Sequence, residues 1–304
     1  MADPLVSIIC ITYNHEPYIR QCLDGFMMQK TNFPFEVLIH DDASTDNTAE
    51  IIREYEDKYP DIIKPIYQTE NQYQKGVKIG ITYLYPRAKG KYIAECEGDD
   101  YWTDPLKLQK QVDFLDNNLE YSMCSHRFKV YNQSVNLWED DWYGTLYEDL
   151  QYDLNSFLEF KSWVTQPLSV LFRREALPLN AIASVEFVRD LTLMYFLLKS
   201  GKGIMLNSVM GVYRKHSNGV WQGASFQEQR TSDFKVCLSI YNYEKTKESS
   251  MLLYNRMSQC RYLGPKYILY NLLTLFSASK VVAKYYGIGA IMRLWINFMN
   301  FKNK

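Results

Sequence analysis

The chain has 304 residues, of which 47% are hydrophobic and 15% aromatic, which is enough for a complete α/β domain with additional elements. Its formal net charge of −1 excludes a nucleic-acid-binding protein that depends on overall positive charge. The six cysteines form no C-x-x-C pair and no zinc-site spacing. We therefore expect reduced, buried thiols in a cytosolic protein, with no signal peptide before the first strand-like run.

Strands and helices alternate over the first 105 residues. Apolar, β-branched runs predict strands over residues 5–14, 35–40, 62–67 and 92–94. Apolar residues at helical spacing predict helices over 18–30 and around Ile51 and Tyr55, with a short helix over 79–85. This alternation is typical of a doubly wound sheet of parallel strands.

Polar clusters follow three of these strands: Thr12-Tyr13-Asn14, Asp41-Asp42-Ala43-Ser44 and Glu97-Gly98-Asp99-Asp100. Ligands of doubly wound sheets bind beyond the carboxyl ends of the strands, so we expect the three clusters to converge on one crevice. No G-x-G-x-x-G follows the first strand, which argues against a dinucleotide site.

The third cluster belongs to an acidic stretch, residues 92–104. Carboxylates this close together repel one another unless a cation joins them. Oxygen ligands on a turn suit Mg²⁺ or Mn²⁺, especially an ion that also contacts a phosphate. The alternative is a solvated acidic loop that precedes the next helix, with Asp104 as N-cap and Pro105 as its first residue.

The second half of the chain continues with a predicted helix over 106–115 and strands over 121–131, 162–174 and 205–213. The segment 138–143 combines aromatic and acidic residues, which fits either sugar binding or a surface loop with partly buried rings. Asp190 begins an apolar helix that Gly201 ends, and as an N-cap it would be an ordinary residue.

Three segments together resemble the family 2 glycosyltransferases of the GT-A fold: V-S-I-I-C-I-T-Y-N, V-L-I-H-D-D-A-S-T-D-N-T and G-K-Y-I-A-E-C-E-G-D-D. The resemblance covers residues 5 to about 222. It implies an inverting transferase that takes a sugar from a nucleotide-sugar, with a divalent metal, Mn²⁺ or Mg²⁺, and one carboxylate base.

The resemblance also implies a set of donor-binding residues: Thr12, Tyr13, Asn14, Glu16, Asp41, Ser44, Lys78, Glu97, Gly98, Asp99 and Asp100. Glu97 stands where the family has the first Asp of its D-x-D motif, so Asp99 is the expected metal ligand. Ile81 stands where many relatives have an arginine that meets the diphosphate. Lys75 or Lys78 could replace that charge, and the alternative for both lysines is a solvated loop.

In the resembled family, the aspartate that opens the second-half helix is the general base, which assigns this role to Asp190. Arg189 precedes it, and a cation there would lower the pKa of the base if the side chains meet. The segment Tyr213–His216 matches the family's Y-R-x-H, so His216 is an expected ligand of the metal or a phosphate, or else a loop hydrogen-bonding residue. The other histidines, His15, His40 and His126, are expected to be structural or exposed.

The expected architecture is a GT-A-like, doubly wound mixed sheet with a C-terminal helical extension. Its glycosyltransferase domain spans residues 1–225, as a nucleotide-binding half (1–105) and an acceptor half (106–225), and its helical extension spans 226–304. Residues 261–304 contain seven basic and no acidic residues. Two amphipathic helices there would suit an anionic membrane surface, and the alternative is a lid packed on the domain.

The expected function is transfer of a sugar from a nucleotide-sugar to a hydroxyl of a glycan or lipid-linked acceptor in surface polysaccharide synthesis. UDP is the nucleotide that the resemblance to the family suggests. The expected location is cytoplasmic or peripheral at the inner face of the plasma membrane. A nucleotidyltransferase is one alternative, although residues 12–16 do not form a triphosphate loop. A non-catalytic carbohydrate-binding protein is the other, and the presence of Asp99 and Asp190 argues against it.

Overall fold

The computed structural model describes residues 3–159, 165–217, 219, 223–257, 279–280, 283–285, 287–289 and 292. These residues form two compact units. The first unit comprises residues 1–153, 164–180 and 194–216, and the second comprises 154–163, 181–193 and 217–304. The expected membrane-binding or lid-forming role of the basic tail falls almost entirely outside the described residues.

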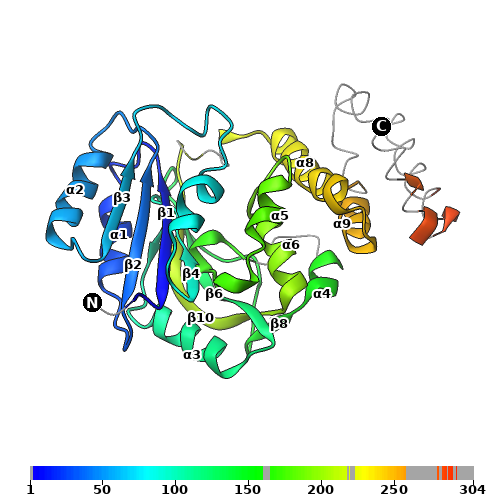
Figure 1. The fold of residues 1–304 in the computed structure, drawn as a ribbon, viewed down its shortest axis with the longest axis horizontal. Helices are drawn as coiled ribbons and strands as arrows, with labels where there is room; N and C mark the ends of the chain where they lie inside the picture. Colours follow the sequence, from blue (N-terminus) through cyan, green and yellow to red (C-terminus); the bar gives the residue numbers. More distant parts are fainter. Residues whose placement is uncertain are drawn as a thin grey trace. The chain divides into compact units, whose positions relative to one another are not determined.

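The first unit begins with alternating strands and helices (Figure 1). These elements are β1 (Val6–Thr12), α1 (Ile19–Met27), β2 (Phe35–Asp41), α2 (Thr48–Lys58), β3 (Ile63–Tyr67), η1 (Gly80–Leu84), η2 (Tyr85–Arg87) and β4 (Tyr92–Glu95). The alternation expected from the sequence is therefore confirmed. The short helix expected over 79–85 is a π-helical turn followed by a 3₁₀ turn.

The unit continues with β5 (Tyr101–Trp102), α3 (Lys107–Asn117), β6 (Tyr121–Asn132), β7 (Leu137–Asp140), β8 (Leu150–Tyr152), η3 (Pro167–Ser169), β9 (Leu171–Arg173), η4 (Arg174–Ala176) and β10 (Lys202–Lys215). A strand over 162–174 was expected, but within the described part of that range, residues 165–174, the strand is limited to Leu171–Arg173. Pro167 lacks the N–H that a ladder needs, and it begins a 3₁₀ turn instead.

All ten strands form one mixed sheet in the order β3-β2-β1-β4-β9-β6-β10-β5, with β7 on β6 and β8 on β10. The pairs β1–β2, β1–β4, β2–β3 and β6–β10 are parallel. The pairs β4–β9, β6–β9 and β10–β5 are antiparallel. This is the mixed α/β sheet that the sequence predicted.

Packing of α1 explains how the acidic stretch is held. Its buried residues Ile19, Cys22, Leu23 and Phe26 follow helical spacing and belong to the main core. At Gly25 a Cβ atom would lie 3.0 Å from the backbone nitrogen of Trp102 in β5. Glycine therefore lets α1 approach β5, the strand that directly follows the acidic cluster.

The second unit contains α4 (Leu154–Glu159), most of α5 (Leu179–Ser184), the start of α6 (Asp190–Ser200), α8 (Phe226–Glu244) and α9 (Lys247–Met257). Ser225 caps α8 by accepting from the backbone of Glu228, in a capping box. Phe234, Cys237 and Tyr241 are buried at helical spacing. These helices confirm the expected C-terminal helical extension over its described part. In that part, no helix has the length and apolarity needed to cross a membrane.

Candidate functional site

The polar clusters that follow β1, β2 and β4 meet at one edge of the sheet. The backbone N–H of Asp42 donates to Thr12 O at 3.0 Å, and Asn14 N–H donates to Ser44 Oγ at 2.9 Å. Gly98 N–H donates to Ile11 O at 3.0 Å. A Cβ atom on Gly98 would lie 2.8 Å from Thr12 Oγ1, so only glycine allows this approach. The convergence expected from the sequence is present.

Two turns at this edge adopt left-handed backbone conformations without glycine. Asn14 has φ 53° and Ala43 has φ 62°. Such conformations cost free energy and concentrate at functional sites. Asn14 is held in place because its side-chain Oδ1 accepts from Thr45 N–H at 2.8 Å.

Asp41 lies almost completely buried beneath these turns, with 2% exposure. Its Oδ1 accepts from the hydroxyl of Ser44 at 2.5 Å. Burial raises the pKa of Asp41, and the hydrogen bonds from Ser44 oppose this effect. The carboxylate of Glu16 accepts from the side chain of Asn47 at 2.7 Å and from its backbone at 3.1 Å, next to the start of α2.

Asp99 faces two imidazoles. Its Oδ2 lies 3.0 Å from Nε2 of His216 and 3.9 Å from Nε2 of His15. Its Oδ1 is buried and has no hydrogen-bond partner among the described residues, and the same holds for Nδ1 of both histidines. Desolvation pushes the pKa of Asp99 up, but the hydrogen bond with His216 and the nearby His15 hold it below its ordinary value.

Asp100 is buried and anchors the end of β10. Its Oδ1 accepts from the backbone of Arg214 at 2.8 Å, while Nε of Arg214 donates to Asp99 O at 2.9 Å. The guanidinium also donates to Gln21 on α1 at 2.7 Å. Burial, followed by the neighbouring charge of Asp99, raises the pKa of Asp100. Asp100 thus supports the loop, and Asp99 is the carboxylate with an unused oxygen.

The remaining predicted donor residues vary in their exposure. Tyr13 and Glu97 are exposed, and Lys78 is half-buried with partners of its own. Lys75 forms an ion pair with Glu70 at the surface, so it does not replace the missing arginine charge. Ile81 lies within η1.

Among the described residues, no group of three or more histidine, cysteine and acidic side chains is arranged to hold a metal ion. The individual atoms nevertheless suit a divalent cation. The unpartnered Oδ1 of Asp99 is a buried hard donor, and His216 adds an imidazole at the same carboxylate. These two residues fit the metal site expected from the sequence.

Asp190 is the first residue of α6, in the second unit, and its side chain is exposed. Desolvation by the surrounding protein raises the pKa of its carboxyl, and the adjacent Arg189 opposes this effect. Arg189 was expected to lower this pKa, and it does pull in that direction, but the net shift is upward. A raised pKa makes this carboxylate a stronger proton acceptor than an ordinary aspartate.

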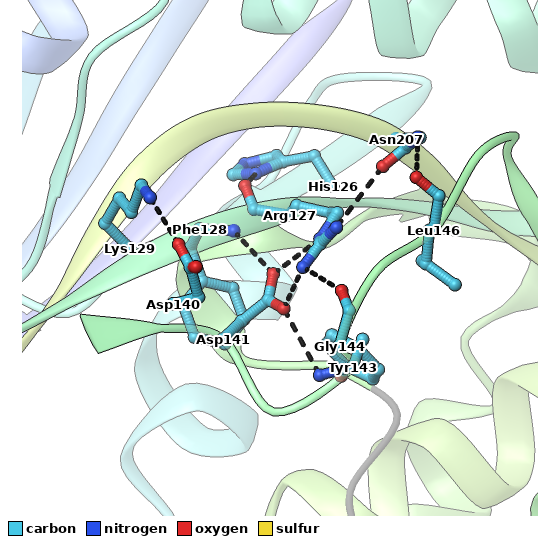
Figure 2. Close-up of polar contacts among 10 residues, drawn as sticks. All are labelled: His126, Arg127, Phe128, Lys129, Asp140, Asp141, Tyr143, Gly144, Leu146 and Asn207. Atoms are coloured by element: carbon cyan, nitrogen blue, oxygen red, sulfur yellow. Dashed lines mark hydrogen bonds and ion pairs between the residues drawn. The ribbon is translucent and has the colours of Figure 1, made fainter.

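The aromatic and acidic segment 138–143 divides into a buried anchor and exposed rings. Figure 2 shows Asp141 pointing toward the guanidinium of Arg127, which donates to it from Nε at 2.9 Å and from Nη2 at 2.6 Å. Trp138 is 54% exposed and stacks on Tyr131 at 4.6 Å between ring centroids. Asp141 therefore holds the loop, whereas the side chains of Trp138 and Trp142 are exposed.

Sequence reasoning missed two site residues, His15 and Arg214. His15 stands beside Asn14 in the first cluster, so its position after a strand end was a usable signal. Arg214 belongs to the Y-R-x-H segment, but its contacts with Asp99 and Asp100 depend on the pairing of β10 with β5. The other two histidines, His40 and His126, are buried.

The sequence matches a family model, that of glycosyl transferase family 2, over residues 7–178. An uncharacterised protein of Mycobacterium tuberculosis (strain ATCC 25618 / H37Rv) is 40% identical over 221 residues, which are 72% of this chain and 61% of that protein. The chain thus spans about 61% of the length of such relatives. The putative teichuronic acid biosynthesis glycosyltransferase TuaG of Bacillus subtilis is 29% identical over 73% of this chain and 84% of its own length.

A shorter match concerns the UDP-Glc:α-D-GlcNAc-diphosphoundecaprenol β-1,3-glucosyltransferase WfaP of Escherichia coli, which is 36% identical over 41% of this chain and 46% of its own length. Among solved structures, Staphylococcus aureus TarS 1–349 in complex with UDP-GlcNAc has a TM-score of 0.60 at 18% identity, covering 91% of this chain and 80% of that one. GalNAc-T7 with UDP, GalNAc and Mn²⁺ has a TM-score of 0.54 at 11% identity, covering 86% of this chain and 51% of that one. These two structures share the fold, and the family model covers more than half of the chain. The chain therefore belongs to glycosyl transferase family 2.

Proposed function

We propose that this protein is an inverting glycosyltransferase that moves a sugar from a nucleotide-sugar, with UDP as the first candidate nucleotide, to a hydroxyl group of a glycan or lipid-linked acceptor. The observation that carries the proposal is the carboxylate of Asp99. It lies at the convergence of three strand-end clusters, it faces His216 at 3.0 Å, and its second oxygen is buried without a partner in the part of the chain that the structure describes. A buried oxygen of this kind is costly unless a ligand completes it.

The donor site in this proposal is the edge formed by the polar clusters. Asp41 and Ser44 would contact the base, while Thr12, Tyr13, Asn14 and Glu16 line the nucleoside pocket beside them. Lys78 and the segment from Glu97 to Asp100 lie toward the diphosphate. The left-handed turns at Asn14 and Ala43 support this assignment, since strained backbone is retained where function requires it.

Asp99 and His216 would hold a divalent cation, Mn²⁺ or Mg²⁺. When bound, such an ion supplies charge neutralisation for the leaving nucleoside diphosphate. The solved GalNAc-T7 complex names Mn²⁺ together with UDP, which makes Mn²⁺ the first ion to test. Arg214 contributes by holding the loop of Asp99 and Asp100 in place from β10.

Asp190 acts as the general base in this proposal. It accepts the proton of the acceptor hydroxyl while that oxygen attacks the anomeric carbon. The bond between the anomeric carbon and the phosphate oxygen breaks, and the diphosphate leaves with the bonding electrons. A single displacement inverts the anomeric centre and needs no second, nucleophilic carboxylate.

The acceptor class rests on the relatives. The name of WfaP gives a diphosphoundecaprenol acceptor, and that of TuaG gives teichuronic acid biosynthesis. A lipid-linked glycan in surface polysaccharide synthesis is therefore the first acceptor to test, with the protein acting in the cytoplasm or at the inner face of the plasma membrane. The basic segment 261–304 is the part of the chain proposed to meet anionic lipid there.

The experiment is a panel of nucleotide-sugars incubated with the protein, Mn²⁺ and a short-chain polyprenyl-diphosphate sugar. Release of nucleoside diphosphate and the anomeric configuration of the product are measured. Transfer with inversion, lost in Asp99→Ala, is the expected result. Release of pyrophosphate in a parallel incubation with a nucleoside triphosphate and a sugar 1-phosphate would indicate a nucleotidyltransferase, and binding without turnover of any donor would indicate a non-catalytic carbohydrate-binding protein.

A further inference from the structure

A hollow of about 680 Å³ opens in the first unit at the edge of the sheet opposite the donor site. Its lining residues are Asp3, Glu36, Leu38, Lys64, Pro86, Arg87, Ala88, Lys89 and Arg174. Glu36 and Lys64 are the second residues of β2 and β3, whereas the donor clusters follow the carboxyl ends of the strands. Asp41 follows Glu36 by five positions in β2, or about 16 Å of strand. The hollow is thus distinct from the site of Asp99.

Four basic side chains surround this hollow, and all four are exposed: Lys64, Arg87, Lys89 and Arg174. In the part of the chain that the structure describes, none of them forms an ion pair with a carboxylate. Other exposed basic residues of the first unit do form ion pairs with carboxylates, for example Arg20 with Glu54 and Arg53 with Glu50. The four basic side chains therefore lie close together, and no direct ion pair with a carboxylate of the described residues neutralises them.

The two guanidinium groups donate hydrogen bonds to backbone carbonyls, and each of them has further N–H groups. Nη1 of Arg87 donates to Tyr83 O at 2.6 Å, and Nε of Arg174 donates to Gly90 O at 2.7 Å. Each guanidinium keeps further N–H groups for a ligand. These backbone contacts also restrict the side chains, which lowers the entropy lost when an anion binds.

The nearby carboxylate of Glu36 is already used. It is 6% exposed, and its Oε1 accepts from Ser7 Oγ at 2.7 Å and from the backbone N–H of Lys89 at 2.9 Å. Together with Asp3 it lowers the formal charge of the lining from four positive charges to two. The hollow remains positive, and its deeper wall is apolar, because Leu38 and Ala88 are 4% and 6% exposed.

We propose that this hollow binds a phosphate-bearing anion, with the two guanidinium groups and two ammonium groups around the phosphate and the organic part against Leu38, Pro86 and Ala88. Arginine forks match the geometry of phosphate oxygens, and lysine adds charge without a fixed geometry. The same chemistry is present in the headgroup of an anionic phospholipid and in a free phosphorylated compound. The two sources are distinguished by the test.

The test uses the full-length protein in EDTA, which removes divalent cations and so suppresses phosphate binding at Asp99. Binding of inorganic pyrophosphate is measured by calorimetry, and binding to phosphatidylglycerol/phosphatidylcholine vesicles by sedimentation. The test variant is Lys64→Gln/Arg87→Gln/Lys89→Gln. The control, Arg20→Gln/Arg53→Gln/Lys58→Gln, removes three exposed charges from α1 and α2 of the same unit.

We expect the test variant to lose affinity for at least one probe by about tenfold or more, the value of one charge-assisted hydrogen bond, while the control binds like the wild type. A loss confined to pyrophosphate identifies a free phosphate compound, and a loss confined to vesicles identifies a lipid headgroup. The single variant Lys64→Glu should weaken the same probe, which keeps the test valid if the triple variant is unstable. Equal affinities in the wild type, test and control proteins would overturn the proposal, as would a wild type that binds neither probe.

Discussion

Nε2 of His216 lies 3.0 Å from Oδ2 of Asp99, although 117 residues separate them in the chain. The contact forms because β10 runs antiparallel to β5 and brings its end back beside the acidic cluster. Arg214, two residues earlier, fixes the same loop through the backbone of Asp99 and the carboxylate of Asp100. The pair joins the acidic motif and the Y-R-x-H motif into one site.

His15 should contribute to diphosphate binding. Its Nε2 lies 3.9 Å from Oδ2 of Asp99, and no described residue hydrogen-bonds to its buried Nδ1. We expect His15→Gln to weaken UDP binding in Mn²⁺ by about tenfold, because one hydrogen bond to a charged group is lost. Uridine, which lacks the phosphates, serves as the control ligand in the same titration. An equal loss for uridine would show that His15 only supports the fold of the turn.

Asp190→Asn should abolish proton transfer without unfolding the protein. Turnover should fall by about 10²–10⁴-fold, the usual contribution of a positioned base. Because the pKa of Asp190 is raised, the rate of the wild type should fall with decreasing pH around a value above the ordinary carboxyl pKa, and the variant should lack that limb. The nearby exposed Glu186, changed to Gln, is the matched control. Near-normal turnover of Asp190→Asn would leave Asp190 without a catalytic role.

The ion pair of Arg127 and Asp141 should stabilise the first unit. The side chain of Asp141 is fully buried, and that of Arg127 is 13% exposed. Arg127→Met leaves a buried carboxylate unpaired, so we expect a loss of about 3 kcal/mol in the free energy of unfolding, measured with urea. Lys129→Met breaks the neighbouring exposed pair with Asp140 and should leave stability unchanged. Similar midpoints for the two variants would contradict the anchoring role.

Lys107 should make stability depend on pH. Burial lowers its pKa to about 7, and the centroid of the Trp102 ring lies 3.8 Å from its Nζ. Within the described ranges of the chain, Nζ has no hydrogen-bond partner. Between pH 7 and the ordinary lysine value, the unfolded chain binds more protons than the folded protein, so this residue makes stability rise with pH. Lys107→Met should flatten that rise and add at least about 1.4 kcal/mol at pH 7, the equivalent of one pKa unit.

The control for this prediction is Lys110→Met, one turn further along α3. Lys110 is exposed and pairs with Asp104. Thermal melts of the wild type and both variants from pH 7 to 9.5 give the dependence of stability on pH for each protein. An unchanged slope in Lys107→Met would mean that the lysine is not neutralised by burial.

The alternation of elements and the convergence of the polar clusters could be predicted from the sequence. The strands of the parallel half are rich in apolar residues, and polar clusters follow the carboxyl ends of β1, β2 and β4, so local pattern and topology agree. Asp99 and His216 were predicted as metal ligands from separate motifs, and the structure places them in contact.

Other features depend on tertiary contacts that no local pattern contains. The run 162–174 is apolar enough for a strand, but Pro167 turns the described part of it into a 3₁₀ turn and a three-residue strand. The segment 138–143 has the aromatic and acidic composition of a sugar-binding loop, yet its Asp141 is bound by the guanidinium of Arg127. A carboxylate oxygen is available to a ligand only if no other side chain binds it, and such side chains are distant in the sequence.

The most direct test of the donor site is a thermal melt with UDP and Mn²⁺, alone and together. If Asp99 holds an ion that contacts the diphosphate, the two ligands together should raise the Tm by more than the sum of their separate effects. Asp99→Ala should remove this synergy, while Asp113→Ala, an exposed aspartate on α3, should retain it. Equal stabilisation by UDP in EDTA and in Mn²⁺, or full synergy in Asp99→Ala, would contradict the proposed site.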